Sequence, residues 1–246
     1  LFLVGSSLLP VFAQTGESTD LTSIVEANGL AESAGTLRRE LLPIIGVVTI
    51  LSLAPGIIMM MTCLPLMVIV FGFLRQAIGL QQSPPSMMIT SLALFLTFFV
   101  MEPVFSEAWA TAVKPYQDGT NSEGEAFNLA MVPFREFMTT RTHEATLVTL
   151  SESLPGRWSQ DELTSPPLSL LIPSFMLSEI KTAFQIGFAI FLPFLAIDLV
   201  AAAILMAMGM MMVPPAVVSL PFKLAFFVMA DGWTKLAGAL LRGYAG

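Results

Sequence analysis

Four charged side chains interrupt otherwise apolar sequence, and their type and setting allow them to do chemistry. Glu179 and Lys181 lie two positions apart, Asp198 follows, and Lys223 comes after a proline pair. A charge inside a bilayer costs roughly 2.5 to 3.5 kcal/mol, so each needs a partner or a polar surrounding. We predict that one of the two carboxylates pairs with one of the two lysines to fix the packing of helices or subunits. A proton or ion relay and a wet vestibule are the alternatives.

Methionine is the second unusual feature. The chain has 16 methionines, and five of them cluster at positions 206, 208, 210, 211 and 212. A thioether is apolar, unbranched and flexible, so a ring of methionines closes a hole by deforming around whatever fills it. Gly209 lies inside the cluster, and Pro214 and Pro215 prevent the helix from continuing, which predicts a turn there. The cluster suits a closable gate, and ordinary lipid-facing or core methionine is the alternative.

Other chemistries are excluded by composition. The only cysteine is Cys63 and the only histidine is His143, which removes disulfide frameworks, Cys/His zinc sites and histidine-based triads. We predict no catalytic residue, metal or cofactor, and therefore not an enzyme. The chain is 55% hydrophobic and only 12% charged, unlike a typical soluble enzyme, and its net charge of −7 argues against nucleic acid.

The helices expected to carry these residues begin after an N-terminal region, residues 1–40, that we do not expect to belong to the helical fold. Residues 1–13, LFLVGSSLLPVFA, form an uncharged apolar run that resembles the end of a secretory signal peptide. Residues 14–40 are polar and glycine-interrupted, and we expect a flexible noncytoplasmic segment.

Residues 41–101 are expected to form a first apolar helical region. Positions 41–74 are 34 residues without a charge, which as one helix would reach about 51 Å against a hydrocarbon core of about 30 Å. The prolines in this run favour a kinked or re-entrant helix. A second apolar run at 87–101 is short for a membrane span.

Residues 102–167 are expected to form a polar, acidic helical domain. They contain ten acidic and four basic residues, a balance of −6, which fits the noncytoplasmic side of a membrane. Apolar residues recur at helical spacing between Met131 and Ser153, which predicts one or two amphipathic helices there.

Residues 168–246 are expected to form C-terminal hairpin helices. The pattern predicts one helix at about 176–212 and another at about 216–241, with the turn at Pro214 and Pro215. Hydropathy alone then gives four crossings for the whole chain.

Several sequence blocks resemble the FliP family of flagellar type III export-gate proteins. The C-terminal blocks are MLSEIKTAFQIG at 176–187, FLPFLAIDLV at 191–200, MGMMMVPP at 208–215, and LPFKLA at 220–225 through DGW at 231–233. The N-terminal blocks are LAP at 53–55, LRQAIG at 74–79 and QQSPP at 81–85. The resemblance covers residues 41–245. The chain departs from it at 59–66, where many relatives are more polar and carry an arginine.

The resemblance implies an all-α fold of membrane-associated helical hairpins in a helical, cone-like oligomeric assembly. It implies a cleaved signal peptide and a methionine gasket, which falls on Met210, Met211 and Met212. Gly209, Pro214 and Pro215 form its hairpin turn. Glu179 and Lys223 fall on the family's charged positions, and with Lys181 and Asp198, which the residues alone single out, they make up the expected inter-helix charge positions.

The function implied is a gated passage for unfolded flagellar subunits across the bacterial inner membrane, within the flagellar basal body and largely on the periplasmic side. The partners implied are five copies of the chain, two smaller gate proteins (FliQ and FliR), the switch-type export protein FlhB, the unfolded substrates and membrane lipid. The alternative from another class is an ion-coupled secondary transporter that uses Glu179 and Asp198. Such a transporter is expected to show two related halves, which this sequence lacks.

Overall fold

The computed structural model describes residues 61–79, 85–154, 156–159, 163–210 and 212–245, with scattered positions between 41 and 60. The segments expected at 1–13 and 14–40 lie outside the described residues. Contacts divide the chain into two units, residues 1–55 and 56–246, and the helices named below belong to the second. All regular elements in the described part of the chain are helical, which confirms the all-α prediction.

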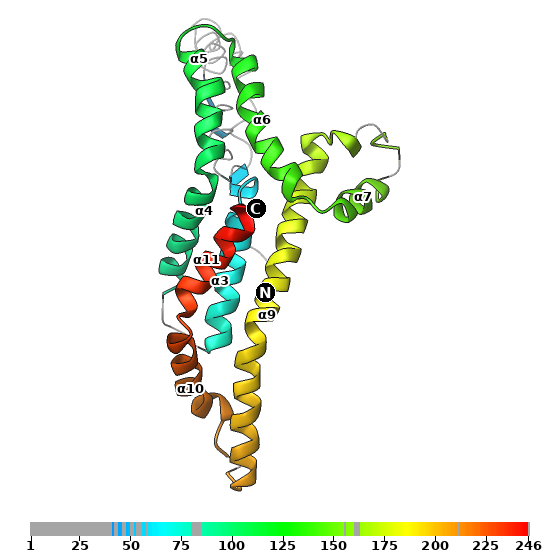
Figure 1. The fold of residues 1–246 in the computed structure, drawn as a ribbon. Coiled ribbons are helices and arrows are strands. Elements are labelled where there is room, and N and C mark those ends of the chain that lie inside the picture. The colour runs from blue at the N-terminus through cyan, green and yellow to red at the C-terminus, as the bar shows by residue number, and fades with distance from the viewer. Residues whose placement is uncertain are drawn as a thin grey trace, which may run out of the picture. The chain divides into compact units, whose positions relative to one another are not determined.

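Helix α3 (Leu64–Ile78) is the centre of the hydrophobic core. Pro65 lies in its first turn, where proline leaves no helical hydrogen bond unmade, and Gly79 ends it at a φ of 86°. Met67, Val70 and Phe71 are completely buried. The helix packs against α9 (Leu168–Ala207) and α4 (Ser86–Ala108), as Figure 1 shows. The apolar run at 41–74 is interrupted by non-helical residues at 61–63, so it does not form one straight helix.

Helix α4 continues past the boundary that we expected between residues 101 and 102. It runs through a π-helical turn, η1 (Trp109–Val113), into α5 (Lys114–Gln117), and the whole stretch is 32 residues long. The apolar run at 87–101 is therefore only part of a much longer helix. Hydropathy could not show this, because Glu102 and Glu107 lie exposed on the helix surface and do not oppose helix formation.

Among the described residues, two helices cover the stretch between Met131 and Ser153 where periodicity predicted one or two. They are α6 (Glu123–Arg141) and α7 (Glu144–Glu152). Helix α6 begins eight residues before the expected start at Met131, because Ser122 and Glu125 form a capping box there.

In its described residues the C-terminal region contains three helices, where two were expected. Helix α9 spans 40 residues and runs through Pro173 and Pro193 without ending. Helix α10 (Pro215–Met229) returns alongside it, and α11 (Gly232–Ala245) follows after a bend of 58° (Figure 1). The expected bounds at 176, 212 and 241 are therefore wrong. The expected turn before Pro215 is present.

Two described stretches are long and apolar enough to cross a membrane. They are Ser86–Gln117 and Leu168–Ala207, and the bent pair of α10 and α11 makes a third if it counts as one span. Hydropathy alone gave four crossings, and the described residues offer two, or three with the bent pair. Much of the first apolar run lies outside the described residues, and its described part contributes the 15-residue helix α3.

Candidate functional site

The candidate site is the α9–α10 hairpin, and its turn is defined by backbone geometry. Helix α9 ends at its C-cap, Met208, and Gly209 follows with a φ of 76°. The Gly209 N–H donates to the Met206 carbonyl at 3.0 Å, and the Met210 N–H donates to the Leu205 carbonyl at 2.9 Å. This pair of bonds is a Schellman motif, which usually places glycine at the left-handed position. A Cβ on Gly209 would touch nothing within 4 Å, so the glycine is required for conformation and not for space.

The methionines of the cluster lie on the surface of the protomer at this turn. Met206 is 65% exposed, Met208 68%, Met210 42% and Met212 97%, while Met211 lies outside the described residues. Pro214 precedes α10, and Pro215 is its first residue. Met67, Met101 and Met138, by contrast, are completely buried in the core. The chain therefore uses methionine in two different settings.

An apolar groove of about 640 Å³ lies beside the methionines, between α9 and α10. Met208, Met210, Ile204 and Phe222 are among the residues that line it. Polar groups contribute almost nothing to its wall. A continuous apolar surface of this kind on one protomer is typical of a region covered by lipid or by another protein.

Asp198 and Lys223 form an ion pair that joins α9 to α10. Lys223 Nζ donates to Asp198 Oδ2 at 2.6 Å, and Ser219 Oγ donates to Asp198 Oδ1 at 2.5 Å. Lys223 Nζ also donates to the carbonyl of Ala77 at 3.2 Å, in the last turn of α3. A cation at a helix C-terminus is favourable because unpaired carbonyls concentrate negative charge there. One lysine thus connects three helices.

Glu179 lies in a second polar cluster, and no lysine approaches it. Its Oε1 lies 3.5 Å from Nε of Arg141, at the end of α6, and its Oε2 accepts a hydrogen bond from Tyr244 Oη. Arg141 Nη1 donates to the carbonyl of Gly243 at 2.7 Å, and its guanidinium lies 4.2 Å from the centre of the Tyr244 ring. Glu179 is only 1% exposed, so both contacts replace water that its carboxylate would otherwise bind.

The four charge positions therefore differ in environment. Asp198 and Lys223 meet within the chain, Glu179 is paired elsewhere, and Lys181 is exposed on α9. Among the residues that the structure describes, no group of three or more His, Cys, Asp or Glu side chains could hold a metal ion.

Arg141 and Tyr244 were not singled out from the sequence. They are far apart along the chain, and no motif links them. The one available signal was composition, because Tyr244 is one of only two tyrosines in the chain.

Comparisons with known proteins identify the family of the chain. The FliP family model matches residues 47–240. The flagellar biosynthetic protein FliP of Caulobacter vibrioides is 45% identical over 233 residues, which cover 90% of this chain and 86% of that protein. Its Bacillus subtilis counterpart is 45% identical, covering 80% and 88%, and that of Rhizobium meliloti is 44% identical, covering 85% and 86%. The resemblance seen in the sequence blocks is confirmed, and the chain belongs to the FliP family.

Proposed function

We propose that this chain is a core subunit of the flagellar type III protein-export gate and forms a closable passage for unfolded flagellar subunits across the inner membrane. The relatives are named flagellar biosynthetic proteins, which supports a role in flagellar export. The apolar helices support a place in the membrane. The observation that carries the gate itself is the exposed methionine turn between α9 and α10.

One protomer cannot form a passage, so the gate requires further copies. The apolar groove beside Met208 and Met210 needs a cover, and sister hairpins supply one of matching chemistry. Ala203 and Ala207 lie exposed one turn apart on α9, and small residues at this spacing allow a second helix to approach closely. Five copies, with FliQ, FliR and FlhB as partners, follow from the resemblance to the family.

The two parts of the hairpin would have different mechanical roles. Asp198 and Lys223 hold α9 and α10 in register well away from the turn, and Ser219 strengthens that contact. The Met210–Met212 turn beyond it is soft, because thioether side chains change rotamer at little cost. An arriving unfolded chain displaces these side chains, and they close again behind it.

The secondary transporter remains the alternative prediction, and no described contact favours it. A coupling ion needs a carboxylate that is free to bind it, whereas Asp198 is already paired with Lys223 and Glu179 with Arg141 and Tyr244. Displacing either partner would leave a poorly solvated charge behind.

A triple replacement tests the gasket. We expect Met210→Ala, Met211→Ala and Met212→Ala together to leave assembly intact and to make cells leak small ions. The matched control replaces Met87, Met88 and Met229 with Ala, since these methionines are also exposed but lie away from the turn. Unchanged permeability in an assembled Met210–Met212 variant, or equal leakage in the control, would reject the gasket.

A further inference from the structure

The contacts at the two ends of helix α11 have no part in the proposed gate. The N-terminal end of the helix is a sharp backbone break, and its C-terminal end is fastened by the Arg141 cluster. Between these ends it is the most amphipathic of the described helices. A backbone break at one end and a small set of contacts at the other allow such a helix to move as one piece.

The N-terminal break has the geometry of a hinge. Asp231 adopts a φ of 51°, a left-handed conformation that non-glycine residues rarely take, and it separates α10 from α11. At Gly232 an added Cβ would lie 2.1 Å from the Phe227 ring, so α11 begins directly against α10. Hinges are a few element-terminal residues that absorb a backbone rotation. Asp231 and Gly232 occupy such a position.

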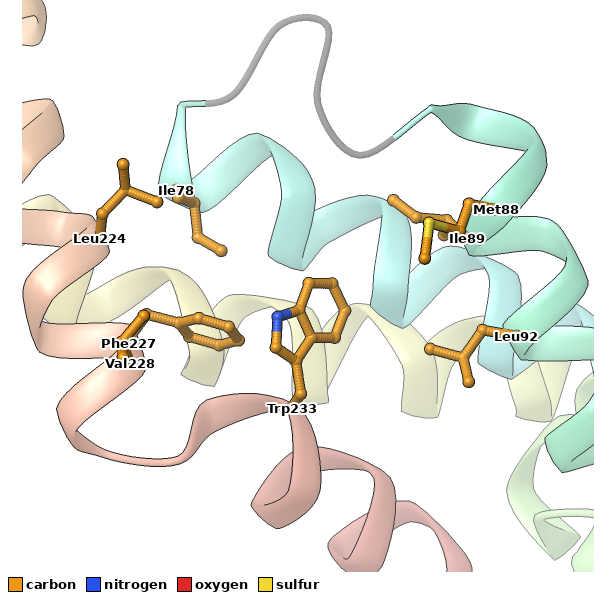
Figure 2. A pocket seen from close by; sticks show the side chains of 8 residues that line it. All are labelled: Ile78, Met88, Ile89, Leu92, Leu224, Phe227, Val228 and Trp233. Carbon is orange, nitrogen blue, oxygen red and sulfur yellow. The ribbon is translucent and has the colours of Figure 1, made fainter.

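Trp233 fills the space next to this hinge. Figure 2 shows its indole projecting from the first turn of α11 toward Phe227, with Ile78 and Ile89 around the same pocket. The ring packs edge-on against Phe227 at a centroid distance of 5.3 Å and stacks on Phe71 at 6.4 Å. The pocket is almost purely apolar and has a volume of about 440 Å³. The indole could therefore shift here without leaving a polar group unpaired.

The C-terminal end of α11 is held by a small number of polar and aromatic contacts, most of which involve Arg141 or Tyr244. Arg141 supplies a hydrogen bond to the Gly243 carbonyl and a cation–π contact to the Tyr244 ring. Tyr244 Oη donates to Glu179, and the Tyr244 ring stacks on Phe137 at 6.2 Å. Arg141 Nε itself makes no hydrogen bond, although it is buried. Movement of the α6 end would therefore release several contacts of α11 at once.

A buried thiol lies beneath this fastening. Cys63 is completely buried in the same core cluster as Leu240 of α11, and Tyr244 packs against that cluster. Burial raises the pKa of the Cys63 thiol to about 12, so the closed protein holds it as an unreactive thiol.

We propose that α11 is a strap, hinged at Asp231 and Gly232 and fastened by Arg141 at Gly243 and Tyr244, which opens without unfolding the other helices. The strap closes over the core around Cys63. Because Arg141 ends α6 and Glu179 lies on α9, the fastening also ties the acidic region to the gate hairpin. The proposal concerns the protomer and does not depend on the gate.

Alkylation of Cys63 tests the strap without any engineered cysteine, because it is the only cysteine in the chain. The full-length protein is solubilised from membranes in mild detergent, with its assembly retained, and treated with N-ethylmaleimide. Mass spectrometry of the Cys63 peptide gives the rate. We expect Arg141→Gln to accelerate labelling at least tenfold, and Tyr244→Phe, which keeps the ring and loses only the hydroxyl, to accelerate it less.

A matched control and a denaturant series separate opening of the strap from general unfolding. Arg242→Gln removes an exposed cation from the same helix and is expected to label at the wild-type rate. Strap opening exposes little surface. The rate of Cys63 labelling at low urea should therefore rise much less steeply with urea concentration than the rate of global unfolding does. The proposal is overturned if Arg141→Gln labels at the wild-type rate, if Arg242→Gln accelerates labelling equally, or if labelling follows global unfolding.

Discussion

The Nζ of Lys223 lies 2.6 Å from Oδ2 of Asp198, so a direct, charge-assisted hydrogen bond joins the two helices of the hairpin. The side chains differ in exposure, at 8% for Lys223 and 34% for Asp198. The lysine therefore depends on this contact more than the aspartate does. If Asp198 is lost, the carbonyl of Ala77 remains as its described hydrogen-bond partner.

Asp198→Asn is expected to lower the free energy of unfolding by about 1–3 kcal/mol, because it leaves a buried cation without its counter-charge. Combining it with Lys223→Met should recover part of that loss, since the double variant buries no unpaired charge. Urea unfolding in detergent, followed by tryptophan fluorescence, measures both. A double variant less stable than Asp198→Asn alone would contradict the importance of this pair.

Gly187 permits the close approach of α9 to α3. A Cβ at this position would lie 2.3 Å from the Phe73 ring, so Gly187→Ala must displace that ring or separate the helices. We expect a clear fall in melting temperature and partial recovery when Phe73→Leu is added. Gly72→Ala on α3 is the control, because its Cβ meets nothing within 4 Å and alanine favours a helix by about 1 kcal/mol over glycine. Equal destabilisation by Gly72→Ala would disprove the contact.

Gly209 is required at the hairpin turn for its backbone conformation, with a φ of 76°. Gly209→Ala is expected to cost about 1 kcal/mol, because a Cβ disfavours the left-handed region. Gly209→Asn should cost less, since asparagine tolerates that region better. Melting temperatures of the two variants, compared with wild type, measure the difference. If the two variants are equally destabilised, the left-handed backbone conformation is not the reason for glycine at position 209.

Part of this structure followed from local sequence rules. Proline cannot continue a helix, so the turn before Pro215 was predictable, whereas the end of α9 before Gly209 was missed, although glycine there is a common helix stop. The start of α6 was also encoded locally, as the Ser122-x-x-Glu125 pattern of a capping box, although apolar spacing placed it later. Rules of this kind involve residues within a few positions of one another.

The polar contacts could not be predicted in the same way. Arg141 and the Gly243 carbonyl are 102 positions apart, and neither residue type specifies the other. One of the two carboxylates was expected to pair with a lysine, and Asp198 does so, but the sequence did not show that the ends of α6 and α11 would supply the partners of Glu179. Such contacts depend on the packing of whole helices around α3. The break at Asp231 contains no proline, but the Asp231-Gly232 dipeptide is a local turn signal that the prediction from the apolar pattern passed over.

The capping box of α6 makes the first turn of that helix sensitive to pH. Glu125 Oε2 accepts a hydrogen bond from the Ser122 N–H at 2.9 Å, which holds the pKa of this carboxyl below its usual value. A lowered pKa in the folded state means that its stabilisation is complete above the ordinary pKa and is lost as the pH falls through the folded value. We expect amide protection in this turn, corrected for intrinsic exchange rates, to be constant above the ordinary glutamate pKa of 4.5 and to fall as the pH is lowered below it. Glu125→Gln can still accept the hydrogen bond but does not titrate, so its protection should stay flat over the same pH change. A wild-type profile that is equally flat would show that the charge on Glu125 does not support the cap.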